Sequence, residues 1–253
     1  MRRARLFLIK IFPRQQLIRW SFMFTAIGKS LFKGKRFYCP ICERSYSKFF
    51  AYGSPARQHA LCPGCLSLER HRLLWFYLKN ETNFFKDKLK FLHMAPEQCF
   101  YKKFKKQKNL DYLTADLDSP LAKVKTDIQA MQFSDNTFDV IFANHVLEHV
   151  EDDIQAMREL YRVLKPGAWA ILQVPADNNR DRTFEDKNVT EPADRERYFG
   201  QHDHWRLYGR DYAGRLAQVG FQVEANRYCE NINQATISKS GLMNEEIIYI
   251  ARK

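Results

Sequence analysis

The sequence predicts an α/β fold with a mainly parallel sheet flanked by helices, preceded by a small metal-binding module and a basic N-terminal arm. Three observations lead to this prediction. From about residue 86, short apolar runs of strand length alternate with helix-like segments, as in parallel sheets with crossover helices. Four of the six cysteines form two C-x2-C pairs, and residues 1–42 hold ten Lys/Arg and no acidic residue.

Residues 1–36 form the predicted basic arm. The chain carries a net charge of +12, but residues 43–253 hold 31 Lys/Arg against 29 Asp/Glu, so the excess lies in the arm. Its apolar stretches, 6–12 and 17–28, are shorter than the roughly 20 residues of a membrane-spanning helix, so no transmembrane segment is predicted. A helix packed on its own domain or on a second subunit, an RNA contact and a peripheral contact with an anionic membrane remain as alternatives.

Residues 37–80 contain the two cysteine pairs, Cys39-Pro-Ile-Cys42 and Cys62-Pro-Gly-Cys65, nineteen residues apart. A two-residue gap lets both thiolates of a pair face one ion, and two pairs complete a tetrahedral shell. This spacing is typical of zinc-ribbon-like sites. Because every ligand is a cysteine, we expect a closed, structural Zn²⁺ site. Two disulfides are the alternative, but C-x2-C loops fit them poorly and no feature indicates export, so a cytoplasmic protein is expected.

Residues 86–253 form the predicted main domain. The run 138–146 has a continuous apolar centre, and Phe100 and Phe104 share one face of a helical segment. An amphipathic helix is expected to stop at Lys165-Pro166-Gly167. Ligands of such sheets bind at the carboxyl ends of the strands. Strands are expected at 89–95, 110–117, 138–146, 168–175, 221–227 and 245–253, and helices at 98–107, 152–164 and 208–220.

The segment 138–172 resembles the central part of class I S-adenosylmethionine-dependent methyltransferases with a type 11-like domain. In that family a buried strand ends in a loop on the cofactor side, and an amphipathic helix leads through an R-V-L-K-P-G-G turn into the next strand. Here Ala168 replaces the last glycine of the turn. The resemblance covers about residues 88–253 and implies a Rossmann-like fold, S-adenosyl-L-methionine as cofactor and methyl transfer as the reaction.

The resemblance also implies where the methionine part of the cofactor lies. The first strand leads into the position of the family's D-x-G-x-G loop. His93 stands at the place of the acid, and Ala95 and Glu97 stand at the places of two glycines. Because glycine has no side chain, its replacement at two positions affects how closely the backbone can approach the methionine part of the cofactor. Glu97 is expected to accept from the ammonium group.

The remaining cofactor contacts implied by the resemblance follow later strands. Asp116, 21 residues after Ala95, is placed to accept from both ribose hydroxyls, with Asp118 as the fallback. Asp127 and Ile128 match the acidic-apolar pair that contacts adenine. Asn144 stands at the boundary between cofactor and acceptor. For each carboxylate, a solvated loop position is the alternative.

Residues 199–212 are a dense polar and aromatic cluster where the family commonly shapes its acceptor pocket. His202 and His204 are candidate general bases, and Arg206 and Tyr208 are candidate contacts to an anionic or hydroxylated acceptor. The alternative is a packed loop with Tyr208 in the core. No further ligand set with convincing spacing accompanies the H-D-H run, so a second metal is not expected.

His145, Glu148 and His149 fit H-x-x-E-H, the pattern of one class of zinc peptidase. That chemistry needs both histidines on one helical face, whereas His145 directly follows a buried strand. We therefore interpret the match as accidental. His145 is a third candidate catalytic residue, expected at the edge of the cofactor where the acceptor enters.

Three functions follow from these features. The first is methyl transfer to a small-molecule or glycan-like acceptor. The second is an rRNA-type RNA methyltransferase that docks RNA through the zinc module and the basic arm; the nearly neutral main domain and the lack of an Asn-Pro-Pro-Tyr-type motif after residue 144 argue against it. The third is a non-catalytic binding module that kept the fold without the glycine-rich loop.

Overall fold

A seven-stranded sheet forms the centre of the computed structural model, which describes residues 14–53 and 55–253. The apolar stretch 6–12 of the basic arm lies outside these residues. In chain order, the strands are β5 (Leu89–Met94), β6 (Leu110–Asp116), β7 (Val124–Lys125), β8 (Phe138–Ala143), β9 (Leu164–Ile171), β12 (Gln222–Asn226) and β13 (Ile248–Arg252). Their order across the sheet is β12-β13-β9-β8-β5-β6-β7. Strands β5 to β9 run parallel, and β13 lies antiparallel to β9 and β12, which confirms the predicted α/β class.

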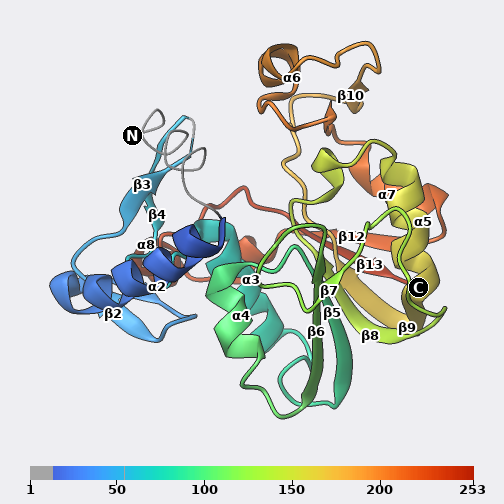
Figure 1. Ribbon diagram of the computed structural model, residues 1–253. Coiled ribbons are helices and arrows are strands. Elements are labelled where there is room, and N and C mark those ends of the chain that lie inside the picture. Colours follow the sequence, from blue (N-terminus) through green and yellow to red (C-terminus); the bar gives the residue numbers. More distant parts are fainter. Residues whose placement is uncertain (1–13, 54) are drawn as a thin grey trace.

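Helices cover both faces of the sheet, as Figure 1 shows. Successive strand side chains point to opposite faces. Accordingly Phe91 of β5 joins the core beneath α3 (Glu69–Asn80) and α4 (Gln98–Phe104), while Leu92 joins the core beneath α5 (Asp153–Val163) and α7 (Tyr212–Gln218). Two separate cores result, one on each face.

The cysteine module consists of two short hairpins. Strands β1 (Lys33–Cys39) and β2 (Arg44–Tyr46) form one, and β3 (Phe50–Tyr52) and β4 (Arg57–Leu61) form the other. The first hairpin begins at Lys33, before the expected boundary at residue 37. The helix α3, which belongs to the expected module range 37–80, packs on the sheet and so joins the module to the main domain.

Several elements depart from the expected pattern. Helix α5 ends at Val163 as its sequence predicts, but 165–167 lie inside β9, where the pairing with β8 is irregular. Gly167 has φ of 75°, a conformation that favours glycine. Besides the four strands of the cysteine module, the elements without a counterpart in the sequence pattern are α3, β7, η1 (Leu147–His149), β10 (Phe184–Glu185), α6 (Pro192–Phe199), β11 (Arg206–Leu207), η2 (Tyr228–Asn231) and α8 (Gln234–Ser240).

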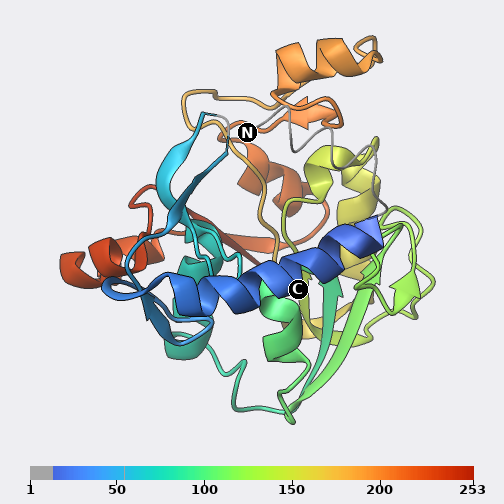
Figure 2. The same cartoon turned by 60° about the vertical axis from the view of Figure 1, so that its left-hand side comes forward.

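Helix α2 (Arg14–Leu31) crosses the front of the molecule beside α4 (Figure 2). It packs through small residues: a Cβ on Gly28 would lie 2.3 Å from the carbonyl oxygen of Pro63, so only glycine fits this contact. Large apolar side chains face outward, with exposed fractions from 53% to 70%, namely Met23, Phe24, Ile27 and Leu31. No helix in the described part of the chain is both long and apolar enough to cross a membrane.

Candidate functional site

The four paired cysteines come together in one cluster. The Sγ atoms of Cys39 and Cys65 lie 3.5 Å apart, those of Cys42 and Cys62 lie 3.8 Å apart, and all four lie within 4.8 Å of one another. Tetrahedral zinc at about 2.3 Å from each sulfur would place the sulfurs about 3.8 Å apart. All four cysteines are free thiols, so the alternative of two disulfides is not realised. The donor set and its spacing fit a zinc ion.

Both C-x2-C turns share one backbone geometry. The N–H of Glu43 donates to the carbonyl of Cys39 at 2.8 Å, and the N–H of Leu66 donates to the carbonyl of Cys62 at 2.9 Å. Glu43 and Leu66 both have left-handed backbones, with φ of 55° and 61°. Non-glycine residues pay about 1–2 kcal/mol for this conformation. Two matching strained turns are therefore best explained by the need to aim both thiols of each pair at one point.

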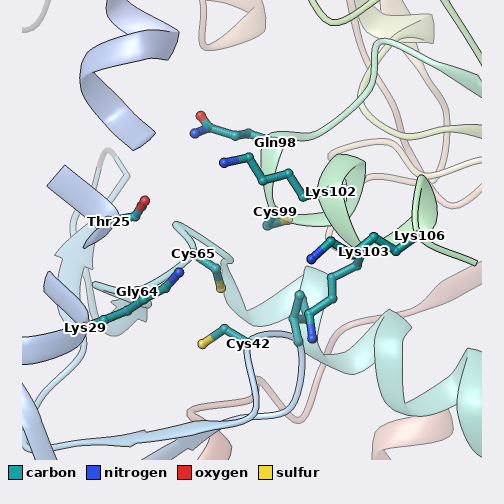
Figure 3. Close-up of a pocket in the computed structure, with 11 residues that line it drawn as sticks. Thr25, Lys29, Cys42, Gly64, Cys65, Gln98, Cys99, Lys102, Lys103 and Lys106 are labelled. Carbon is teal, nitrogen blue, oxygen red and sulfur yellow. The ribbon is translucent and has the colours of Figure 1, made fainter. Parts of the chain in front are cut away.

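A hollow of about 230 Å³ lies beside this cluster, between α2, the cysteine turns and α4 (Figure 3). Lysines surround it: Lys29, Lys102, Lys103 and Lys106. Lys103 pairs with Glu43 at 3.3 Å. The rim of the hollow is thus basic, which continues the charge of the N-terminal arm onto the main domain.

The carboxyl end of β5 carries the expected cofactor loop. Ala95 has φ of 46°, so it occupies the backbone conformation that glycine adopts without strain. His93 is fully buried: its Nδ1 lies 2.9 Å from the hydroxyl of Tyr112, and its Nε2 contacts the carboxylate of Glu97. His93 therefore supports the loop through Tyr112 and Glu97, and its predicted contact with the cofactor stays a prediction.

The carboxylate of Glu97 is a buried anion held by several donors. Burial raises its pKa, but His93, His71 and Asn144 outweigh burial and lower the pKa to about 2. Its Oε1 accepts from Nδ2 of Asn144 at 2.9 Å. The Oδ1 atom of Asn144 is buried and has no hydrogen-bond partner in the part of the chain that the structure describes. A carboxylate beside an unsatisfied amide oxygen fits an ammonium donor, such as the amino group of the expected cofactor.

Asp116 ends β6, Asp127 follows β7, and each carboxylate accepts hydrogen bonds within its own loop. Oδ1 of Asp116 accepts from the N–H groups of Asp118 and Ser119 at 2.8 and 2.6 Å, which leaves Oδ2 for a ligand. Oδ1 of Asp127 accepts from the N–H of Gln129 at 2.8 Å. Both carboxylates are half-buried. They occupy the strand ends at which the sequence places the ribose and adenine contacts.

Ile128 is 4% exposed and belongs to the core beneath α5. A buried isoleucine packs against the core and has little exposed surface on which adenine could stack. Its predicted contact with the cofactor thus remains a prediction, and the structure assigns it a packing role as well.

A cavity of about 550 Å³ opens at the carboxyl ends of β8 and β9. His145 and the residues after β9 form its wall on the sheet side. The module forms another wall through Tyr52, Arg57 and Arg70, and the segment before β13 supplies Glu245 and Glu246. Sequence reasoning missed all these residues except His145. They come from segments far apart in the chain, and no local motif links them.

His145 is held in a defined orientation at this cavity. Its Nδ1 lies 3.2 Å from Oε1 of Glu148, which is 1% exposed. A neutral imidazole that donates from Nδ1 to a carboxylate presents Nε2 as an acceptor. Nε2 of His145 is buried and has no hydrogen-bond partner within residues 14–53 and 55–253. The pair therefore combines a base with the group that orients it.

The segment 199–212 gives a different result from the one expected. Arg206 is 3% exposed and donates to the carbonyls of Leu147 and Val150, at 2.9 and 2.6 Å, and Tyr208 is fully buried. Their interpretation as acceptor contacts is wrong, because packing and hydrogen bonds inside the protein use both side chains. The packed-loop alternative is correct for these two residues.

The two candidate bases of that segment differ from each other. His202 is exposed, whereas His204 is 3% exposed and lies against the ring of His149, with ring centroids 4.8 Å apart. Neither is among the residues that line the 550 Å³ cavity. Among the three candidate catalytic histidines, the geometry favours His145.

Comparison with known proteins finds a family match over part of the main domain. Residues 92–172, from β5 to just past β9, match the family described as "Methyltransferase domain". Cycloartenol-C-24-methyltransferase 1 of Oryza sativa subsp. japonica is 50% identical over 62 residues, which are 22% of this chain and 18% of that protein. The ubiquinone/menaquinone biosynthesis C-methyltransferase UbiE of Klebsiella pneumoniae is 48% identical over 49 residues, 19% of this chain and 20% of that one. The chain thus spans about a fifth of the length of these relatives.

A likeness to solved structures supports the fold. The S-adenosylmethionine-dependent methyltransferase of Mesorhizobium loti has a TM-score of 0.50 and 16% identity, and the match covers 72% of this chain and 98% of that one. At this identity the likeness extends to the arrangement of strands and helices. The main domain therefore has the Rossmann-like fold that the sequence analysis expected.

Proposed function

We propose that this chain is an S-adenosylmethionine-dependent methyltransferase that acts on a polar small molecule or glycan-like acceptor, with a structural zinc ion in its cysteine module. The observation that carries the proposal is the placement of Glu97, Asp116, Asn144 and His145. Asp116 ends β6, and the other three follow β5 and β8, so all four lie at the carboxyl ends of parallel strands, where such folds bind ligands. The family match spans the same strands.

Different residues of the site would bind the cofactor and accept the proton during methyl transfer. The bound cofactor supplies an electrophilic methyl group on a sulfonium. Asp116 would hold the ribose, and Glu97 with Asn144 would hold the ammonium group. As the acceptor nucleophile bonds to the methyl carbon, the bond from that carbon to sulfur would break and leave a neutral thioether, and His145 would accept the proton that the nucleophile releases. The protein thus contributes mainly position and proton transfer.

The cavity argues for a polar small acceptor. Its volume of about 550 Å³ lies within the range of small-molecule sites, which run from about 300 to 1,000 Å³. Charges of both signs line it: Arg57 pairs with Glu69 at 2.9 Å, and Arg70 and Glu246 face the same space. Burial raises the pKa of Glu246. A polar or zwitterionic molecule would find partners for both charges.

Replacing Asp116 with asparagine is expected to weaken cofactor binding by about 10- to 100-fold, the usual worth of a hydrogen bond to a charged group. Asparagine keeps an oxygen for the N–H groups of Asp118 and Ser119, so the loop should persist. Isothermal titration with S-adenosylmethionine measures the effect. Asp118→Asn tests the fallback assignment and should leave the affinity unchanged. Equal affinities of Asp116→Asn and wild type would contradict the ribose assignment. No saturable binding to the wild type would favour the non-catalytic alternative.

The acceptor class can be read from the distribution of transferred label. Wild-type protein, labelled S-adenosylmethionine and fractionated cell extract are expected to give labelled small molecules, and His145→Asn is expected to give about 10²- to 10⁴-fold less. Asparagine suits this position because His145 has φ of 55°. Label in RNA would instead support the rRNA-type alternative, for which the lysine-lined hollow offers a docking surface.

We also propose that α2 places the protein peripherally on an anionic membrane surface. Met23, Phe24, Ile27 and Leu31 form an exposed apolar face, and the surrounding residues 1–42 carry only positive charge. This combination is typical of helices that lie in the lipid headgroup region. Anionic lipid, rather than a second protein, matches the absence of acidic residues across the arm.

The double variant Phe24→Ser/Ile27→Ser is expected to lose most binding to vesicles that contain anionic lipid, and added salt is expected to weaken binding of the wild type. Vesicle co-sedimentation measures both effects. Leu117→Ser, which removes an equally exposed leucine on another surface, is the control and should bind as the wild type does. Salt-independent binding, or equal binding by the double variant, would contradict this proposal, as would a dimer that the double variant dissociates.

A further inference from the structure

A second group of metal-ligating side chains lies outside the cysteine cluster. Glu148, His149 and His204 each offer one ligand atom, and these three atoms lie within 4.8 Å of one another. The set joins η1 to the segment that follows α6. His145, the other histidine of the H-x-x-E-H pattern, is not part of it. The arrangement is therefore different from the peptidase site that the pattern suggests.

Two of the three side chains are buried with an unsatisfied atom. Glu148 is 1% exposed and His204 is 3% exposed. Oε2 of Glu148 and Nε2 of His204 have no hydrogen-bond partner among the described residues. Leaving a buried polar atom unpaired costs about 1–3 kcal/mol, and more for a charged group. Two unpaired buried atoms, on side chains whose candidate ligand atoms lie within 4.8 Å of one another, indicate that a ligand belongs to this group.

The remaining polar atoms of the three side chains are held in the way that metal ligands usually are. Nδ1 of His204 lies 3.2 Å from the carbonyl oxygen of Phe199, and Nδ1 of His149 lies 3.3 Å from both the carbonyl and the carboxylate oxygens of Asp203. Histidines that bind metals commonly donate their other N–H to a carbonyl or carboxylate, which leaves the second nitrogen unprotonated. Oε1 of Glu148 is likewise occupied by His145.

We propose that Glu148, His149 and His204 bind a divalent transition-metal ion. Two imidazoles and one carboxylate suit zinc, iron(II), manganese(II) or cobalt(II), and a set of three leaves further positions open to water. His149 has a side chain that is 35% exposed, which provides access from solvent. The site is independent of the methyltransferase proposal, because it rests on these contacts alone.

The ion would fix the loop that carries the candidate base. The N–H of Trp205 already donates to the carbonyl of Glu148 at 2.8 Å, and Arg206 donates to the carbonyl of Leu147. A metal between Glu148 and His204 would add a link between these two segments to the hydrogen bonds that already join them. Since Glu148 also orients His145, the occupied site would hold that imidazole at the cavity more rigidly.

Manganese(II) is the probe that separates this site from the cysteines, because it prefers nitrogen and oxygen ligands to thiolates. The full chain is first loaded with one equivalent of zinc, and manganese binding is then followed by electron paramagnetic resonance. One manganese ion per chain is expected for the wild type. His149→Ala and Glu148→Gln are expected to bind it at least tenfold more weakly, with the zinc content unchanged.

His202→Ala is the matched control, since His202 is an exposed histidine two residues from His204. It should bind manganese as the wild type does. A second readout is the thermal midpoint, which manganese should raise in the wild type and in His202→Ala but not in His149→Ala. Failure of the wild type to bind manganese at millimolar concentration would overturn the proposal. Equal binding by wild type, His149→Ala and Glu148→Gln would overturn it as well.

Discussion

Cys62→Ser is expected to abolish zinc binding and to unfold the cysteine module while the main domain stays folded. The module is built from hairpins with strands of three to seven residues, and isolated two-stranded hairpins are marginal in water. Structural zinc supplies an apparent 10 to 16 kcal/mol in small zinc-finger peptides. Without the fourth ligand, the module should therefore lose its main source of stability.

Zinc content and limited proteolysis measure this effect. New cleavage is expected between β3 and β4, in the hairpin that forms a wall of the cavity. Methyl transfer should fall more than affinity for S-adenosylmethionine, because the β3–β4 hairpin lines the cavity whereas Asp116 and Asn144 belong to the main domain. Cys229→Ser is the control: Cys229 is also a buried free thiol, but it lies outside the cluster. A Cys62→Ser protein with full zinc content and the wild-type cleavage pattern would contradict the assignment.

Features of the structure that depend on local periodicity or spacing could be predicted from the sequence. The apolar run at β8 and the amphipathic pattern of α5 each reflect one element that buries one or two faces, so the α/β class and the main strands were predictable. The cysteine cluster was predictable because two C-x2-C turns can serve one ion. These features can be read from neighbouring residues.

Features that depend on distant segments were not predictable. The polar sequence around Arg206 suggested that it binds a ligand. In the structure its guanidinium donates hydrogen bonds to backbone carbonyls of a loop more than fifty residues earlier in the chain. The H-D-H run lacked a partner at a recognisable spacing, whereas the fold brings His204 to Glu148 and His149. The cavity at His145 likewise combines a module hairpin with the segment before β13. Only tertiary structure reveals such combinations.

Arg72 shows how one residue joins the module to the main domain. Its side chain is fully buried in α3. Nε donates to the carbonyl of Ser240 at 2.6 Å, Nη2 to that of Gly241 at 2.9 Å, and Nη1 to those of Ala60 and Ser67 at 2.9 and 2.8 Å. One guanidinium thus donates hydrogen bonds to β4, to the second cysteine turn and to the end of α8.

Arg72→Met is expected to lower the free energy of unfolding by about 3–5 kcal/mol, because it leaves several buried carbonyls without this donor. Arg72→Lys keeps the charge but has a single ammonium, which cannot match the planar fork, so it should lose nearly as much. Gly241 limits relaxation, since its φ is 56° and a Cβ there would lie 2.8 Å from the carbonyl of His59. The surrounding backbone is thus too closely packed to collapse around methionine.

Urea unfolding followed by circular dichroism measures the change, and Lys79→Met on the same helix is the control because Lys79 is exposed. Zinc content should remain at one equivalent in Arg72→Met under native conditions, since Arg72 binds carbonyls and contributes no ligand to the cluster. This separates the loss of module docking from the loss of the ion seen with Cys62→Ser. A decrease below about 1 kcal/mol, the size of an ordinary substitution, would show that the four carbonyls find other partners and that Arg72 is not the link between the two parts.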